Sequence, residues 1–305
     1  MAIVKTDVPM TAARTEAAIE ELVRRYPFLR SEVLARTAGG RNIRTLVLGN
    51  GKRKVIYSGA HHANEWITAT LLLKFAEDFA GALESGGEIF GVPAAEVAAG
   101  TTIYMVPMVD PDGVDLVTGA IEEGSAEYIR ARGIGENFPG IPFPDGWKAN
   151  LAGVDLNLQY PAGWLRAREI KFSQGFTKPA PRDYVGRAPL NQPESRALAG
   201  YTEYLEPDLV LAYHAQGKEI YWTFREYEVP GARELGERMA RVSGYTLAEP
   251  APESSFAGYK DWFIQNFRRP GYTIEVGSGT NPLPLSQFEE IYRDNLGILV
   301  TAALG

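Results

Sequence analysis

Short apolar runs bounded by turn residues alternate along this chain with longer segments whose apolar residues recur at helical spacing. The runs at residues 103–109, 209–213 and 272–276 are too short for helices of usual length and predict buried strands. Helices are predicted at residues 11–25, 66–83, 194–205, 232–243, 259–267 and 285–303. Because parallel strands need a long crossover, usually a helix, this order predicts an α/β fold with helices covering a mostly parallel sheet.

Two further regions predict how the sheet is connected and surrounded. Apolar residues 46–48 and 55–57 flank a Gly-Asn-Gly turn at residues 49–51, which predicts a hairpin at one edge of the sheet. Residues 133–193 are rich in Gly and Pro and only weakly periodic, so we expect a loop-rich insertion that walls a cleft. No repeat, low-complexity tract or linker-like composition divides residues 1–305, which predicts a single domain.

Charge and composition exclude several classes of partner. The chain has 38 acidic and 31 basic residues, a net charge of −7, and no block of like charge, so neither nucleic acid nor a membrane surface is an expected partner. The absence of cysteine excludes disulfides and thiolate ligands, and leaves nitrogen and oxygen to hold any metal. Without a signal-peptide pattern or a membrane-length apolar stretch, we expect a cytoplasmic protein. Nothing in the sequence indicates an oligomeric state.

The chain has only three histidines, and each follows an apolar run that is predicted to be a strand. His61 and His62 follow one run and His214 follows another, so all three are expected at the carboxyl edge of the sheet. A catalytic zinc commonly takes three protein ligands, two close in sequence and one remote, and leaves one position open. His62, Glu65 and His214 meet this description and predict a site for one Zn²⁺ per chain.

Alternatives to this metal site remain open from the residues alone. A histidine three residues before a glutamate is a weak signal, since polar residues at strand ends often have this spacing. His61 competes with His62, because it lies four residues before Glu65 and would share its face on a helix. The position after the strand favours His62, and His61 is then expected to support the site. Cobalt or manganese also suits two imidazoles and one carboxylate.

A carboxylate is needed to accept a proton from the attacking water, and Glu275 is the predicted base. It lies in the apolar run at residues 272–276, where an unpaired carboxylate is costly to bury unless its function requires it there. The alternative is a structural glutamate held in a salt bridge.

The order of these residues resembles a known family. An H-x-x-E pair, a distant histidine and a late strand glutamate occur in the order of the zinc carboxypeptidase family, and the resemblance spans most of the chain. It is more specific to the bacterial branch that hydrolyses γ-D-glutamyl bonds to a diamino acid in peptidoglycan peptides. The segments that carry this likeness are residues 107–114, 147–150, 153–164, 214–222 and 275–284. The resemblance implies a three-layer α/β/α sandwich around a mixed, mostly parallel sheet of about eight strands.

By the same resemblance, several residues acquire expected roles. Lys148 falls where the family has a cation, usually arginine, that stabilises the oxyanion. Asn157 matches an asparagine that helps to hold a substrate carboxylate. Its neighbour Leu158, however, replaces the arginine with which typical carboxypeptidases grip the free C-terminus.

The resemblance also assigns residues to the pocket for the substrate side chain. Lys260 aligns with the residue that selects this side chain, and favours an anionic group such as the second carboxylate of diaminopimelate. Gln216 and Gly217 are also assigned to substrate binding. The family's mobile tyrosine has no obvious counterpart, and Tyr259, a weak substitute, is expected on a helix surface.

The expected function is therefore that of a zinc metallopeptidase acting on cell-wall muropeptides, and the resemblance implies that it acts during cell-wall recycling or sporulation. The predicted bond links γ-D-glutamate to meso-diaminopimelate or lysine. The alternatives are a carboxypeptidase that releases acidic C-terminal residues, a catalytically silent muropeptide-binding protein, and a deacylase of small N-acyl amino acids.

Overall fold

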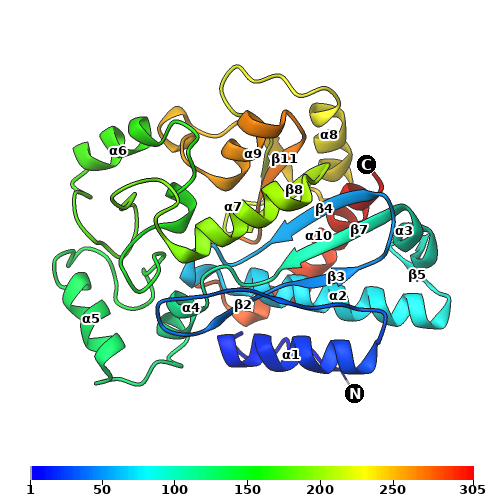
Figure 1. Ribbon diagram of the computed structural model, residues 1–305, viewed down its shortest axis with the longest axis horizontal. Helices are drawn as coiled ribbons and strands as arrows, with labels where there is room; N and C mark the ends of the chain where they lie inside the picture. Colours follow the sequence, from blue (N-terminus) through cyan, green and yellow to red (C-terminus); the bar gives the residue numbers. More distant parts are fainter. Residues whose placement is uncertain (1) are drawn as a thin grey trace.

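The computed structural model describes residues 2–305, which form a mixed sheet of seven strands in the order β10-β9-β11-β8-β4-β7-β3 (Figure 1). Neighbouring strands run parallel, except for the antiparallel pairs β9 with β11 and β3 with β7. The strands are β3 (Leu46–Leu48), β4 (Arg53–Ser58), β7 (Thr101–Val106), β8 (Leu209–His214), β9 (Glu219–Tyr221), β10 (Thr246–Ala248) and β11 (Gly271–Glu275).

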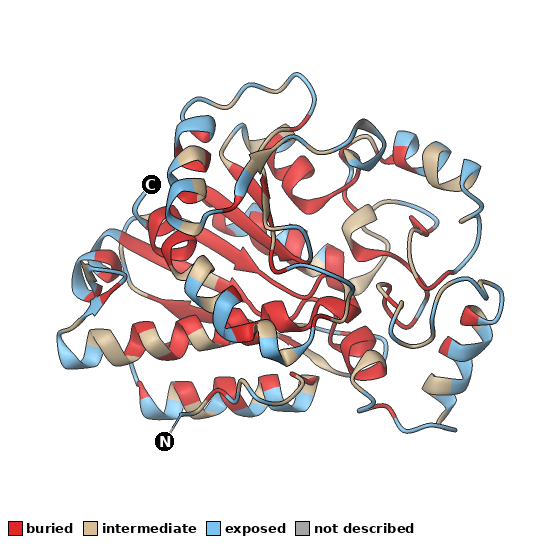
Figure 2. Ribbon diagram, turned by 180° about the vertical axis from the view of Figure 1, so that it is seen from behind, coloured by how far each residue is buried: buried red, intermediate tan, exposed pale blue. Residues whose placement is uncertain are grey.

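Helices cover both faces of this sheet. One face packs against α1 (Ala12–Arg25), α2 (Ile67–Ser85), α3 (Ala94–Gly100), α8 (Ala232–Ser243) and α10 (Phe288–Leu304), and the other against α7 (Pro193–Leu205) and α9 (Tyr259–Phe267). Successive strand side chains point to opposite faces, so Val55 and Tyr57 of β4 enter the first core while Ile56 enters the second. Figure 2 shows the buried sheet between the two helical layers. The predicted three-layer α/β/α fold is confirmed, with seven strands where about eight were expected.

Shorter elements surround the sheet. Beyond the carboxyl ends of β4 and β7 lies the long connection predicted to be rich in loops, which contains only short helices (Figure 1, green). None of the helices between residues 2 and 305 combines the length and apolar character needed to cross a bilayer. The remaining elements are α4 (Pro111–Val117), α5 (Ala126–Gly135), α6 (Trp164–Ser173), the pairs β1 (Val33–Arg36) with β2 (Asn42–Arg44) and β5 (Glu88–Ile89) with β6 (Val92–Pro93), and the 3₁₀ turns η1 (Ala63–Glu65), η2 (Leu156–Leu158), η3 (Pro252–Ser254) and η4 (Leu285–Gln287).

The hairpin predicted at residues 46–57 is wrong, because β7 lies between β3 and β4 and pairs with both. The glycines of this segment instead allow its backbone to pass close to the backbone of residues 98–101. A Cβ on Gly51 would lie 1.9 Å from the carbonyl carbon of Gly100, and one on Gly49, whose φ is +76°, would lie 2.3 Å from the carbonyl oxygen of Thr101. The connection therefore passes against the start of β7, which requires glycine as strongly as a tight turn does.

Candidate metal centre

The three predicted metal ligands come from two neighbouring strands of the sheet. His62 follows β4, and the 3₁₀ turn η1 then places Glu65 above it, since residues three apart eclipse in such a turn. His214 is the last residue of β8, the strand that pairs in parallel with β4. Their ligand atoms all lie within 4.8 Å of one another, so the carboxyl edge of the sheet brings the predicted set together.

The distances between these atoms fit a shared ion. Nδ1 of His62 lies 2.9 Å from Oε1 of Glu65, Nδ1 of His214 lies 2.9 Å from Oε2 of Glu65, and the two Nδ1 atoms are 3.3 Å apart. Bonds of about 2.1 Å to one tetrahedral ion place ligand atoms about 3.4 Å apart. Two imidazoles and one carboxylate are also a donor set of catalytic zinc. The residues therefore fit one zinc ion.

The electrostatics of the cluster favour the metal-binding protonation state of Glu65 and His214. Burial alone would raise the pKa of Glu65, but His62 and Lys148 hold it well below its usual value, so the carboxylate is ionised. Burial lowers the pKa of His214, which keeps this imidazole neutral. Burial lowers the pKa of His62, but Glu65 and Asp155 outweigh burial and raise it to about 9, so a bound metal ion must displace a proton from this imidazole. Metal ligands must be a deprotonated carboxylate and neutral imidazoles.

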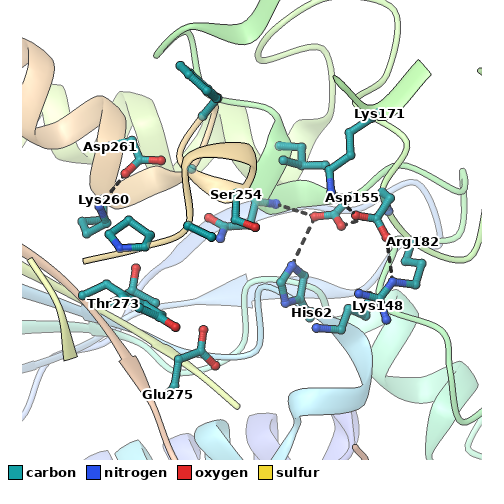
Figure 3. Close-up of a pocket in the computed structure, with 18 residues that line it drawn as sticks. His62, Lys148, Asp155, Lys171, Arg182, Ser254, Lys260, Asp261, Thr273 and Glu275 are labelled. Carbon is teal, nitrogen blue, oxygen red and sulfur yellow. Dashed lines mark hydrogen bonds and ion pairs between the residues drawn. The ribbon is translucent and has the colours of Figure 1, made fainter. Parts of the chain in front are cut away.

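Asp155 orients His62 from outside the cluster, a role that the sequence did not indicate. Its Oδ1 lies 3.2 Å from Nε2 of His62 (Figure 3), and its Oδ2 accepts a hydrogen bond from the backbone of Asp183. The side chain is almost wholly buried, and His62 holds its pKa far below the usual range, although burial opposes this. A carboxylate on the second nitrogen sets the tautomer of a metal-binding histidine and aims its ring.

We expect Asp155→Asn to lower zinc affinity by about 10- to 100-fold, because the amide cannot fix His62 as the carboxylate does. Competition with a chromogenic chelator measures this affinity. Asp183→Asn is the matched control, since Asp183 pairs with Lys171 and Arg182 and contacts no predicted ligand through its side chain. Equal zinc affinities of the two variants would contradict the role of Asp155.

His61 lies behind the cluster and is not part of it. Its buried ring stacks on His214 with centroids 5.4 Å apart, and its Nε2 is 3.4 Å from the hydroxyl of Tyr160. Tyr259, expected on a helix surface, is instead fully buried beside His61, and its hydroxyl lies 2.7 Å from that of Thr202. That expectation is wrong because the first turn of α9 faces the site and not the solvent.

Glu275 lies beside the cluster, at the end of β11 and opposite His214 in the parallel register. Withdrawal from water and then the charge of Glu65 raise its pKa to about 8, against the opposing effect of Lys148. Within the described part of the chain it forms no salt bridge, so the structural alternative has no support. A carboxyl group with a pKa near neutrality suits proton transfer in both directions.

A cavity opens over the candidate metal centre in two connected parts. The inner part measures about 300 Å³ (Figure 3) and the outer part about 840 Å³. Both are lined by His62, Lys148, Asn157, Arg182, Tyr221 and Glu275. The candidate ligands, the predicted base and several polar side chains therefore share one space.

Lys148, predicted to stabilise the oxyanion, and Asn157, predicted to bind a substrate carboxylate, both line this cavity. Nζ of Lys148 donates to Oε1 of Glu65 over 2.9 Å. Asn157 accepts a hydrogen bond from the backbone of Tyr259 through Oδ1, and its Nδ2 has no partner among residues 2–305. Leu158 lines the inner part and brings no charge there. The roles of Lys148 and Asn157 stay predictions.

The other predicted substrate residues are spread over the cavity. Lys260 lines the inner part, where its ammonium lies 2.5 Å from Oδ1 of Asp261. Gln216 lines the outer part and accepts a hydrogen bond from the backbone of Gly279. Gly217 follows it but is not among the residues that line either part.

Two polar residues of the cavity had not been singled out from the sequence. Arg182, from the long connection, donates through Nε to Asp183, and its two terminal nitrogens make no hydrogen bond within the described chain. Tyr221 of β9 donates its hydroxyl to Glu219. The predicted cleft-walling role of residues 133–193 was the only signal for Arg182, and nothing in the local pattern indicated Tyr221.

A buried carboxyl group on α7 makes the stability of the fold depend on pH. Burial, and then the charge of Asp112, raise the pKa of Glu194 from 4.5 to about 7. Between these values the folded chain holds more protons than the unfolded chain, so stability falls as pH rises through this window. We expect Glu194→Gln to reduce this slope, since the contribution of Glu275 remains, and to raise the melting temperature at pH 8 by several degrees.

Thermal unfolding from pH 4 to pH 9 measures this effect. Glu203→Gln is the control, because Glu203 lies on the same helix but is exposed, and it should keep the slope of the wild type. The amide that replaces the carboxyl group of Glu194 can still accept the hydrogen bond that Asn150 donates to Oε2. Parallel pH profiles for wild type and Glu194→Gln would argue against the raised pKa.

The sequence of this chain is similar to those of known zinc carboxypeptidases and of bacterial proteins. The sequence model of the zinc carboxypeptidase family matches residues 15–297. The gamma-D-glutamyl-L-diamino acid endopeptidase 1 of Lysinibacillus sphaericus is 43% identical over 282 residues, which cover 92% of this chain and 69% of that protein. The uncharacterized protein YqgT of Bacillus subtilis (strain 168) is 36% identical over 93% of this chain and 74% of its own length.

Solved structures share the fold at low sequence identity. Thrombin activatable fibrinolysis inhibitor superposes with a TM-score of 0.76 at 16% identity, over 100% of this chain and 76% of that one. The murein-tripeptide amidase MpaA of Escherichia coli O157 gives a TM-score of 0.55 at 18% identity, over 89% of this chain and 91% of that one. At such identities the likeness supports the fold alone.

Proposed function

Because this chain belongs to the zinc carboxypeptidase family, we propose that it hydrolyses the bond between γ-D-glutamate and a diamino acid in cell-wall muropeptides. It is a zinc metallopeptidase, and His62, Glu65 and His214 would hold its one zinc ion. The observation that carries the reaction is the convergence of these three side chains in the cavity that also contains Glu275. The substrate proposal rests on the similarity to the Lysinibacillus endopeptidase.

Each nearby side chain has a definite task in such a hydrolysis. Zinc held by His62, Glu65 and His214 would supply Lewis acidity to the scissile carbonyl and to the attacking water. Glu275 accepts the proton of the attacking water as the C–O bond forms, and delivers it to the leaving nitrogen as the C–N bond breaks. Lys148 stabilises the negative charge that develops on the carbonyl oxygen. Asp155 holds His62 in position.

The charges of the cavity support a substrate with a free carboxylate on the residue before the scissile bond. A D-glutamate linked through its side chain has such a group, because its free α-carboxylate is separated from the scissile carbonyl by only the three carbons of its chain. Arg182 and Lys148 bring positive charge to the shared part of the cavity, and Arg182 has terminal nitrogens free of protein partners in the described chain. Leu158, which replaces the arginine of typical carboxypeptidases, favours this reaction over release of an ordinary C-terminal residue.

Digestion of defined peptides tests this proposal by mass spectrometry. The zinc-loaded protein is expected to cut L-Ala-γ-D-Glu-meso-diaminopimelate faster than the same peptide with an ordinary α-linked L-glutamate. A peptide ending in L-glutamate represents the alternative carboxypeptidase, and faster cleavage of this peptide would overturn the substrate proposal. A protein that binds zinc but cuts none of the peptides would point to the silent binding protein. Location in the cytoplasm and a part in cell-wall recycling stay predictions.

A further inference from the structure

A buried pair of opposite charges, Lys260 and Asp261, forms one end of the inner cavity. Both residues belong to the first turn of α9, and their side chains are only 6% and 5% exposed. Figure 3 shows the pair at one end, Lys148 and Arg182 at the other, and Glu275 between them. A substrate positioned at Glu275 therefore reaches this pair with the part that extends away from Arg182.

The protein leaves both charges of the pair incompletely satisfied. Nζ of Lys260 lies 2.5 Å from Oδ1 of Asp261 and donates to the carbonyl of Thr223, which leaves one of its three N–H groups available. Oδ1 of Asp261 is buried against this ammonium, and Oδ2 of Asp261 accepts no hydrogen bond from the residues that the structure describes. Burying an ion pair is costly unless further hydrogen bonds satisfy both of its partners. A pair left incomplete on the wall of a cavity is suited to a ligand that completes it.

We propose that Lys260 and Asp261 together bind the amino-acid group at the end of a diaminopimelate side chain. Lys260 takes the carboxylate of this group and Asp261 takes its ammonium, so one carbon of the ligand presents both charges to the pair. A ligand with only one of these charges leaves the other protein charge without a new partner. This inference rests on the proposed function and extends it, because Asp261 makes the pocket specific for a zwitterion and not only for an anion.

Two analogues of diaminopimelate distinguish the contribution of Lys260 from that of Asp261. Lysine is diaminopimelate without the distal carboxylate, and 2-aminopimelate is diaminopimelate without the distal ammonium. Hydrogen bonds to charged groups contribute about 1.5–3 kcal/mol, which corresponds to roughly 10- to 100-fold in binding. The wild type is therefore expected to prefer meso-diaminopimelate over each analogue by at least about tenfold in kcat/KM.

The experiment compares L-Ala-γ-D-Glu peptides that end in meso-diaminopimelate, L-lysine or L-2-aminopimelate, with zinc content measured in every sample. Lys260→Met is expected to abolish the preference over lysine, and Asp261→Asn the preference over 2-aminopimelate. The double variant leaves no unpaired charge in the pocket and should cleave the three peptides with similar kcat/KM. It tests the inference if a single variant fails to fold. Lys171→Met removes a lysine at the other end of the cavity and should keep the wild-type ratios.

The outcomes distinguish a failure of this inference from a failure of the proposed function. Cleavage of all three peptides by the wild type at similar kcat/KM overturns the role of the pair and leaves the proposed function intact. Cleavage of none of them overturns both. Single variants that change all three rates by the same factor also contradict the inference, because a merely structural role would produce that result.

Discussion

Glu275→Gln is expected to keep one zinc ion per chain and to lose more than about a hundredfold in kcat/KM, the usual contribution of a general base. Glutamine matches the carboxylate in size but cannot accept the proton of the attacking water. Glu275 is not one of the three clustered ligands, so zinc binding should be unaffected. Hydrolysis of the γ-D-glutamyl peptide and zinc analysis of the same sample measure the two quantities.

Glu219→Gln is the matched control for this prediction. Glu219 lies opposite Glu275 in the antiparallel register of β9 and β11, and its carboxylate accepts the hydroxyl of Tyr221. It lines neither part of the cavity, so this variant should keep its rate within about tenfold, a loss smaller than that of a missing base. A Glu275→Gln enzyme as active as the control would remove Glu275 from the reaction.

His214→Ala is expected to abolish stoichiometric zinc binding and, with it, essentially all activity. One carboxylate and one imidazole remain, which is fewer than the three protein ligands of a catalytic zinc site. Because hydrolysis depends on the Lewis acidity of the ion, the activity is lost with the metal. Equilibrium dialysis against zinc, followed by metal analysis and a peptide assay, measures both losses.

His61→Gln is the control that separates a ligand from its neighbour. His61 stacks on His214 but lies outside the cluster, so this variant should retain zinc under conditions where His214→Ala has none. A His61→Gln protein without zinc, or a His214→Ala protein that keeps both zinc and activity, would overturn the assignment of ligands.

The helices and central strands were predictable because their signals are local. Apolar periodicity reports which side of a segment is buried, and the predicted helices at residues 232–243 and 259–267 coincide with α8 and α9. The Gly-Asn-Gly segment was interpreted wrongly because a tight turn and a close backbone approach require the same residue. These glycines allow the close approach to the start of β7, a strand that lies about 50 residues further along the chain.

Some residues of the candidate site were likewise predictable from the sequence, and others were not. His62, Glu65, His214 and Glu275 could be selected because unusual residue types follow apolar runs, and strand ends meet at one edge of an α/β sheet. Asp155 could not, since no spacing in the sequence relates it to His62, which lies 93 residues away. Lys260 was found by resemblance alone, and that resemblance did not indicate its pairing with Asp261.

By itself, the sequence determined the long helices and the central strands, which residues have the chemistry of a metal site, and the family to which the chain belongs. These properties follow from burial patterns and residue types, which each segment carries regardless of its neighbours. Only the tertiary structure decided the strand order, the stacking of His61 on His214, the support of His62 by Asp155, and the charge pair at the end of the cavity. Each of these depends on distances between side chains from separate segments, and only the packing of those segments sets such distances.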